Sequence, residues 1–307
     1  MNIKEEMIME TSLYQKNKII LFLIIVSFAI VVFMAFPMPV SADTGPKASL
    51  KISVKNLPEG EVYLDLLVDY PAQMGEDGKP FGVETDYSSE YYNQDMIAIL
   101  KAYNVDGWRP ALVTGTSAPL WGSLKVDVYS GNATSSFSYF GVPSRFKIIV
   151  VTENGDVVVS NIVEKKAFQS VVDFDFATGI AKERSLATLA VKQFAVTLPI
   201  TLAIEALVLL AFGFSMRQNW KPFLLINLCT QVGLHLGIMF ANSMFGFVAG
   251  LLAYVGLELT IFIVEAVLFA LLLKQHSKLR RVLFALSANA ASFIVGLWLL
   301  INLAVLG

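Results

Sequence analysis

The chain has 307 residues, of which 55% are hydrophobic, and its mean hydropathy is +0.62. This is too apolar for an ordinary soluble domain, so we expect a membrane protein with part of its mass in water. The net charge is −2, and no region is basic enough to indicate a nucleic-acid partner.

Acidic and basic side chains are distributed unevenly along the chain. Residues 43–180 carry 18 acidic and 11 basic side chains, whereas residues 193–307 carry three acidic and six basic ones. We interpret the acidic region as a water-facing domain, because surplus charge favours solubility. Cys229 is the single cysteine and lies in an apolar run, so neither an intrachain disulfide nor a cysteine-based metal motif is expected.

The first 42 residues are predicted to be a secretory signal. Lys16 and Lys18 precede the uninterrupted apolar run Ile19–Phe36, and small residues stand at Ser41 and Ala42, which predicts cleavage after Ala42. The alternative is an uncleaved anchor, because the apolar run is just long enough to span a membrane.

Residues 43–177 are predicted to form an extracytoplasmic β domain. Ala48–Lys55 alternates apolar and polar residues with period two, which is typical of a half-buried strand. Further strands are expected at 61–68, 123–129, 135–140, 146–152, 157–163 and 168–176, with a hairpin turn at 153–155. A loop is expected at 71–89 and a short helix at 90–103. The short strands favour an antiparallel, β-sandwich-like fold of immunoglobulin size, although the Cys–Trp–Cys pattern of immunoglobulin domains is absent.

Residues 178–192 have helical propensity and carry Lys182, Glu183, Arg184 and Lys192. We expect a juxtamembrane helix that lies on the membrane surface and leads into the first span. The remainder of the chain, 193–307, is predicted to be a transmembrane bundle of four helices at roughly 193–214, 222–243, 247–273 and 282–305.

Loop charges predict the orientation of the spans. Basic residues concentrate in the loops 216–221 and 274–281, while the connection near 241–246 holds no charge. By the positive-inside rule the two basic loops are cytoplasmic, which places residues 43–192 outside, in agreement with the signal sequence. The protein is therefore expected to be a multi-pass protein of the cell membrane, with the architecture of many bacterial membrane proteins.

Each predicted span carries polar residues at spacings that place them on one helical face. These residues are Thr201, Glu205, Asn227, Gln231, His235, Glu258, Glu265, Asn289 and Ser292. From the rise per residue of about 1.5 Å, Glu205, Gln231, His235 and Glu258 are expected in a middle layer. Asn227, Glu265 and Asn289 are expected in a second layer nearer the cytoplasm.

Three interpretations of these polar residues stay open. They hydrogen-bond the helices together; they form a proton, ion or small-solute site in which the glutamates titrate and His235 relays; or they form a metal-dependent hydrolytic centre. In the last case Glu205, His235 and Glu258 supply an oxygen–nitrogen–oxygen set suited to zinc, with Glu265 as a base.

Our leading hypothesis is non-enzymatic and requires no cofactor. The β domain binds or senses a ligand outside the membrane, and the bundle anchors it and couples it to a membrane-protein partner or to proton movement. The expected partners are membrane lipid, an envelope ligand and another membrane protein. A transporter component and an intramembrane metal-dependent hydrolase are the alternatives.

Overall fold

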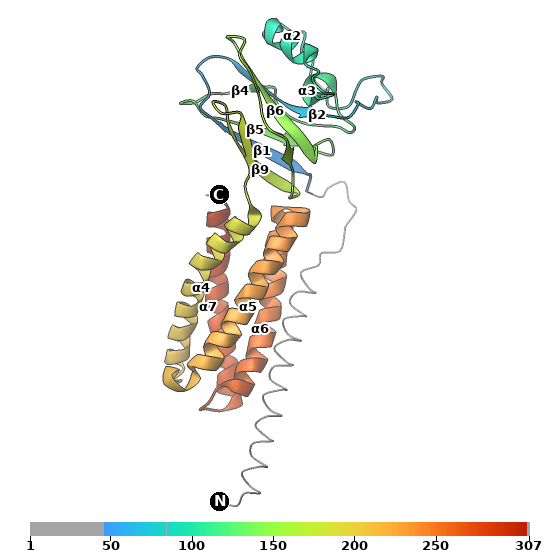
Figure 1. Cartoon of the computed structure of the whole chain (residues 1–307). Helices are drawn as coiled ribbons and strands as arrows, with labels where there is room; N and C mark the ends of the chain where they lie inside the picture. Colours follow the sequence, from blue (N-terminus) through green and yellow to red (C-terminus); the bar gives the residue numbers. More distant parts are fainter. Residues whose placement is uncertain (1–45, 84, 306–307) are drawn as a thin grey trace, which may run out of the picture. The chain divides into compact units, whose positions relative to one another are not determined.

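The computed structural model describes residues 46–83 and 85–305, which fall into a β domain and a helical unit (Figure 1). The predicted signal sequence, residues 1–42, lies outside the described residues. Each unit has a hydrophobic core of its own. We describe the two units separately.

The first sheet of the β domain has the strand order β10–β9–β1–β5. The strands are β10 (Ile180–Glu183), β9 (Gln169–Asp175), β1 (Ser49–Lys55) and β5 (Ala133–Ser138). The period-two pattern of β1 is confirmed, because Leu50, Ile52 and Val54 are buried. However, β1 and β9 are parallel, so the expectation of a wholly antiparallel domain is wrong at this pair. Strands that are far apart in sequence can pair in either direction, and no hairpin dictates the choice here.

The second sheet is antiparallel throughout its described pairs. Its strands are β3 (Arg109–Pro110), β2 (Val62–Val68), β6 (Arg145–Thr152) and β7 (Val157–Val159), with β4 (Lys125–Val126) paired to β2 and β8 (Val163–Glu164) paired to β6. The predicted hairpin at 153–155 is confirmed: Gly155 has a φ of 83° and closes the turn between β6 and β7. The strand expected at 157–163 is instead two short strands.

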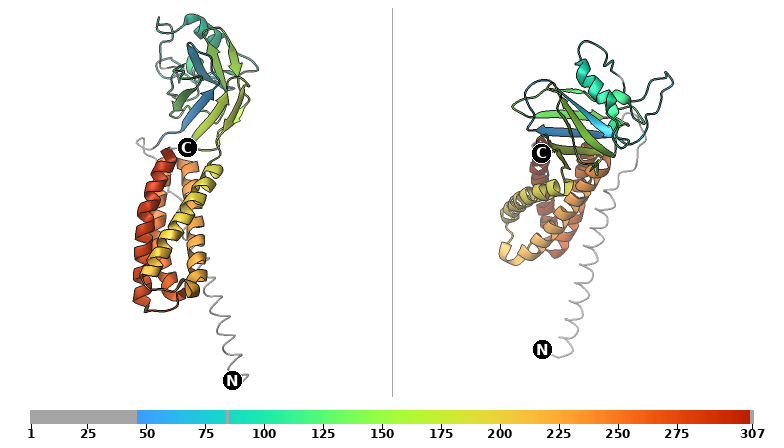
Figure 2. Two further views of the ribbon diagram at one scale, coloured as in Figure 1. Left: turned by 90° about the vertical axis from the view of Figure 1, so that its left-hand side faces the viewer. Right: turned by 45° about the horizontal axis from the view of Figure 1, so that its top comes forward.

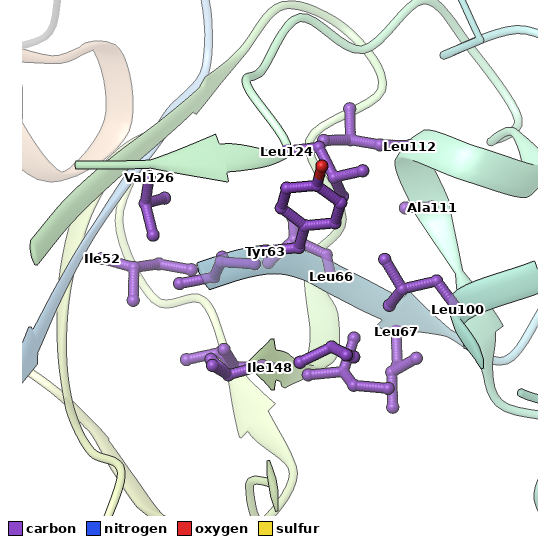
Figure 3. Close-up of a cluster of buried hydrophobic side chains, with 14 of the residues drawn as sticks. Ile52, Tyr63, Leu66, Leu67, Leu100, Ala111, Leu112, Leu124, Val126 and Ile148 are labelled. Carbon is purple, nitrogen blue, oxygen red and sulfur yellow. The ribbon is translucent and has the colours of Figure 1, made fainter. Parts of the chain in front are cut away.

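The centre of the β domain is strand β2, whose seven residues are all buried. Two short helices pack against this sheet: α3 (Ala111–Thr114) contacts β2, and α2 (Gln94–Ala102) contacts β6 and α3. In Figure 3, Leu66 and Leu67 of β2 lie among Leu100 of α2, Ala111 of α3 and Ile148 of β6. The same hydrophobic cluster includes residues of β1, so it draws on both sheets.

The helix expected at 178–192 is not found over its first part. Ile180–Glu183 form strand β10, which pairs with β9 after a turn at Gly179 (φ 68°), and the helix begins only at Leu186. Pairing with an open sheet edge supplies partners for backbone groups, and such a tertiary contact outweighs helical propensity.

The helical unit contains four helices that are long and apolar enough to cross a membrane, which fits a multi-pass membrane protein. They are α4 (Leu186–Ala211), α5 (Met216–Phe245), α6 (Phe247–Leu272) and α7 (Lys278–Val305), and Figures 1 and 2 show them side by side as a bundle. The basic segment 216–221, predicted to be a loop, is the start of α5. The connections at this end of the bundle are therefore short.

Side chains at and just before the start of α7 contact backbone carbonyl groups at the ends of α4 and α6. Arg280 Nε donates to the Phe212 carbonyl at 2.9 Å, and Arg281 donates to the Ala270 carbonyl at 3.1 Å. His276 Nε2 lies 2.9 Å from the Gly213 carbonyl. Carbonyl groups at helix C-termini lack partners within the helix and favour cations, so these basic side chains complete the ends of α4 and α6.

Candidate functional site

The polar residues that the sequence predicts on one face of each helix are largely inside the bundle. Glu205 of α4 and Glu265 of α6 are each 1% exposed, and Asn227 of α5 is fully buried. Glu258, Gln231, Asn289 and Ser292 are also buried, together with Thr230, which the sequence reasoning did not single out. Leucine, isoleucine and valine occupy much of the exposed surface of the same helices. Hydrocarbon penalises unsatisfied polar groups, so the polar faces meet in the interior.

Glu265 has a hydrogen-bond donor for each carboxyl oxygen. Thr230 Oγ1 of α5 donates to Oε1 at 2.6 Å, and Asn289 Nδ2 of α7 donates to Oε2 at 2.9 Å. Three helices thus converge on one carboxyl group. Hydrogen bonds of this kind to both oxygens stabilise an ionised carboxylate, because it can only accept.

Only one of the two carboxyl oxygens of Glu205 has a hydrogen-bond donor. Ser292 Oγ of α7 donates to its Oε1 at 3.1 Å, but the same hydroxyl is 3.2 Å from the Asn289 carbonyl, so its one hydrogen serves two acceptors. Oε2 of Glu205 is buried and has no hydrogen-bond partner among the described residues. The Glu265 carboxyl group is its electrostatic neighbour. Within hydrogen-bond distance, Glu205 therefore has the Ser292 hydroxyl as a donor to Oε1, and the Asn227 side chain is a second polar neighbour of the carboxyl group.

The Asn227 side chain interacts with the Glu205 carboxyl group, and its own oxygen atom also lacks a partner. Its Nδ2 donates to the Phe223 carbonyl at 3.0 Å within α5, while its Oδ1 is buried without a partner in the described part of the chain. Two neighbouring side chains thus each present an acceptor oxygen that lacks a donor. We call Glu205, Asn227, Glu265, Asn289, Ser292 and Thr230 the carboxyl cluster.

Glu258 lies at the edge of the carboxyl cluster. It neighbours Tyr254 one turn earlier on α6 and interacts electrostatically with Glu205 and Glu265. Tyr254 itself donates to the Phe293 carbonyl at 3.0 Å and stacks on the Phe293 ring. Glu258 is thus an electrostatic neighbour of both cluster glutamates.

His235 lies apart from the carboxyl cluster in its contacts. Its Nε2 is 2.9 Å from Thr197 Oγ1 of α4, its Nδ1 is 2.9 Å from the Gln231 carbonyl, and Phe194 packs edge-on against its ring. Both ring nitrogens are engaged. Within residues 46–83 and 85–305, no three His, Cys, Asp or Glu side chains are grouped so as to hold a metal ion. The predicted zinc set of Glu205, His235 and Glu258 is therefore not brought together as a ligand group.

The expected layers also differ in one member. Glu205, expected beside His235 in the middle layer, neighbours Glu265 and Asn227 of the expected second layer as well as Glu258 of the middle layer. The reason lies in the helix bounds: α4 begins at Leu186 and ends at Ala211, nearer the N-terminus than the predicted span 193–214. Glu205 consequently lies close to the end of its helix. Thr230 follows Asn227 by three residues and Gln231 follows it by four, so all three lie on one face of α5. This spacing could have added Thr230 to the predicted polar face.

A second feature lies on the first sheet of the β domain. An open groove of about 840 Å³ is lined by Lys55, Asp127, Asn132, Asp173 and Arg184, together with Tyr129, which is 83% exposed. Arg184 makes a two-pronged contact with Asp173, its Nε and terminal nitrogen donating at 2.9 and 2.7 Å. This pairing raises the pKa of Arg184, so its charge is retained in the groove. The lining offers hydrogen-bonding groups and an aromatic ring to a polar ligand.

No protein-family model, curated protein or solved structure matches this chain.

Proposed function

We propose that the helical unit binds and releases a proton at Glu205, as the proton-handling part of a multi-pass membrane protein. The observation that carries this proposal is the pair of buried, donor-deficient oxygens, Glu205 Oε2 and Asn227 Oδ1. If Glu205 is protonated on Oε2, the resulting O–H group donates a hydrogen bond to Asn227 Oδ1. Both oxygens then have a hydrogen-bond partner. Ionisable groups inside a membrane are by default functional sites.

The neighbouring Glu265 supports the same assignment. Its two donors favour the ionised form, and two adjacent carboxylates in a medium of low dielectric constant repel strongly. One proton shared by the pair avoids this repulsion, as in carboxyl pairs elsewhere. Glu205, with fewer donors, is the member that holds the proton. Release of that proton leaves two charges in the bundle and gives the site two electrostatically distinct states.

The test uses the full chain in lipid nanodiscs. Infrared difference spectra recorded across a pH titration should contain the carbonyl stretch of a buried carboxylic acid. Glu205→Gln should remove the bundle's contribution to that band and leave the contribution of the buried Asp65 carboxyl group, while the new amide still donates to Asn227 and keeps the bundle folded. Asn227→Leu should retain the band but shift its frequency, because the hydrogen-bond acceptor is lost. The matched control is Glu61→Gln in the β domain.

Proton handling is then measured in proteoliposomes. Glu205→Gln should abolish a proton flux, or a proton-linked activity, that the wild-type chain supports. If Glu205→Gln leaves both the carboxyl band and the flux unchanged, Glu205 serves only to hold the helices together and the proposal is wrong.

A second candidate function belongs to the β domain, for which we propose ligand binding or sensing outside the membrane. The groove beside Tyr129 and Arg184 is the observation that favours it. The basic end of the bundle supports the outside location, because the positive-inside rule makes that end cytoplasmic and α4 then begins outside. The hydrophobic cluster shared by both sheets supports a sandwich-like arrangement. Thermal-shift measurements with small polar solutes should find a stabilising ligand whose effect is lost in Tyr129→Ala; no such ligand would argue against this function.

A further inference from the structure

A compact aromatic cluster lies on the surface of the β domain. The Trp121 ring stacks on Tyr139 with centroids 4.4 Å apart, and Phe140 meets Tyr139 edge-on at 4.9 Å. Lys47 Nζ lies 4.6 Å from the centroid of the Phe140 ring. Trp121 is 50% exposed and Phe140 is 63% exposed. We call these four residues the aromatic rim.

Backbone contacts make the rim rigid. Gly141 N donates to the Pro119 carbonyl at 2.7 Å, and a Cβ atom on Gly141 would lie 2.7 Å from that same oxygen. Trp121 and Ser138 exchange two backbone hydrogen bonds, at 3.0 and 2.9 Å. The two segments that carry the aromatic rings are thus held by main-chain contacts and need little ordering on binding.

Strand register fixes which end of the first sheet carries the rim. Ser49 at the start of β1 is opposite Ser138 at the end of β5 and Gln169 at the start of β9. Tyr139 N donates to the Ala48 carbonyl at 3.0 Å. The rim therefore lies at the end of the sheet where β1 and β9 begin.

The chain leaves the domain at this same end. Strand β10 runs antiparallel to β9 and finishes at Glu183, opposite Val172, so it runs toward the start of β9. Only Arg184 and Ser185 separate β10 from the first residue of α4. Two residues reach at most about 7 Å. Helix α4 has 26 residues, about 39 Å, which exceeds a hydrocarbon core of about 30 Å, so part of it extends into the headgroup region.

We propose that the aromatic rim inserts into the phospholipid headgroup region of the membrane that α4 crosses. Tryptophan and tyrosine concentrate at membrane interfaces because each has an apolar ring and a polar group. Phe140 adds apolar area, and the Lys47 ammonium group meets lipid phosphates. The insertion makes a second attachment of the β domain to the membrane, in addition to the covalent connection at Ser185. It does not depend on proton binding at Glu205.

The first experiment uses Trp121 as the reporter. The full chain with Trp108→Phe, Trp220→Phe and Trp298→Phe is placed in nanodiscs of phosphatidylcholine and phosphatidylglycerol, with or without brominated acyl chains. Trp121 emission should be quenched strongly by the brominated lipid and protected from iodide in the water. The matched control retains only Trp108, which is buried within the same domain, and should be quenched little by either agent.

A second measurement avoids changes to the tryptophans. In a Cys229→Ser background, a nitroxide is attached to Phe140→Cys. If this position contacts lipid, the nitroxide should be more accessible to oxygen, which dissolves in the bilayer, than to a water-soluble nickel complex. A nitroxide on Tyr129→Cys should report water, because residue 129 precedes the first residue of β5 whereas residue 140 follows the last. The nanodiscs contain no partner protein. If the aromatic rim binds a protein instead of lipid, the label should therefore remain exposed to water. Iodide-accessible Trp121 and a water-exposed label at position 140 would overturn the proposal.

Discussion

Thr230 on α5 donates a 2.6 Å hydrogen bond to Oε1 of Glu265 on α6. The Thr230 hydroxyl also lies 3.0 and 3.1 Å from the carbonyl oxygens of Ile226 and Asn227 in its own helix. The contact with the carboxyl group is the shortest of the three. This single contact ties two spans together and accounts for one of the two oxygens of Glu265.

Removal of that hydroxyl should destabilise the bundle. Thr230→Val keeps the shape of the side chain but leaves Glu265 Oε1 buried without a donor, which costs about 1–3 kcal/mol. The measurement is reversible unfolding of the full chain in mixed micelles. Thr260→Val is the matched control, because Thr260 is only partly buried and its hydroxyl donates within its own helix, to the Gly256 carbonyl. Equal stability of the two variants would contradict the structural role of the Thr230 contact.

Two glycines of the bundle should respond to alanine in opposite ways. A Cβ atom on Gly296 of α7 would lie 2.6 Å from the hydroxyl oxygen of Tyr254, which is buried and stacked on Phe293. Gly296→Ala should therefore cost about 1–3 kcal/mol, since the tyrosine ring cannot move away freely. Gly256→Ala meets no atom within 4 Å and should be neutral, or stabilising by up to about 1 kcal/mol through helical propensity. Thermal unfolding in detergent distinguishes the two, and a stabilised Gly296→Ala would show that α6 and α7 are not packed closely there.

Stability of the β domain should fall as the pH rises from about 4 to about 7. The Asp65 carboxyl group is fully buried and accepts hydrogen bonds from the backbone N–H groups of Leu66 and Leu112. Burial raises the pKa of Asp65 to about 7, although these hydrogen bonds oppose the change. A raised pKa in the folded state means that the stabilisation is complete below the unfolded pKa of about 3.9 and is lost as the pH passes through the folded value. The loss amounts to at most about 4 kcal/mol, from 1.36 kcal/mol per pKa unit.

The measurement is denaturant unfolding of the full chain at several pH values, followed by the fluorescence of Trp108 in the domain core. Asp65→Asn should flatten the dependence between pH 4 and pH 7, because the amide does not ionise. Asp127→Asn, at an exposed position, should leave it unchanged. A slope that persists in Asp65→Asn would assign the pH dependence to another group.

Membrane orientation can be tested with two introduced cysteines in a Cys229→Ser background. Asn154→Cys lies at the exposed tip of the β6–β7 hairpin, and Ser277→Cys lies in the exposed connection before α7. If the β domain is outside, a membrane-impermeant maleimide added to intact cells should label position 154 at once and position 277 only after permeabilisation. The reverse pattern would show that the positive-inside reasoning fails for this chain.

Local sequence patterns predicted most of the secondary structure. Helix α6 and the strands β1, β2, β6 and β9 were predicted within one residue of their bounds, because length, apolar content and period two are properties of short segments. The other three spans were predicted to begin four to seven residues later than α4, α5 and α7 do. The polar face of each helix was predictable for the same reason. Strand β10 was not, because its extended conformation depends on the free edge of β9, a contact that a local pattern cannot report.

The sequence by itself predicted a β region followed by four apolar helices that carry carboxyl groups. Only the tertiary structure decided that Glu265 has a donor at each carboxyl oxygen while Glu205 has one at Oε1 alone. It also decided that His235 bonds to Thr197 instead of joining them. The physical reason is that helical periodicity tells which face a residue occupies but not which residue of another helix meets it. Helix ends and packing set that match, and among the described residues they leave the buried Glu205 Oε2 and Asn227 Oδ1 atoms without a hydrogen-bond partner.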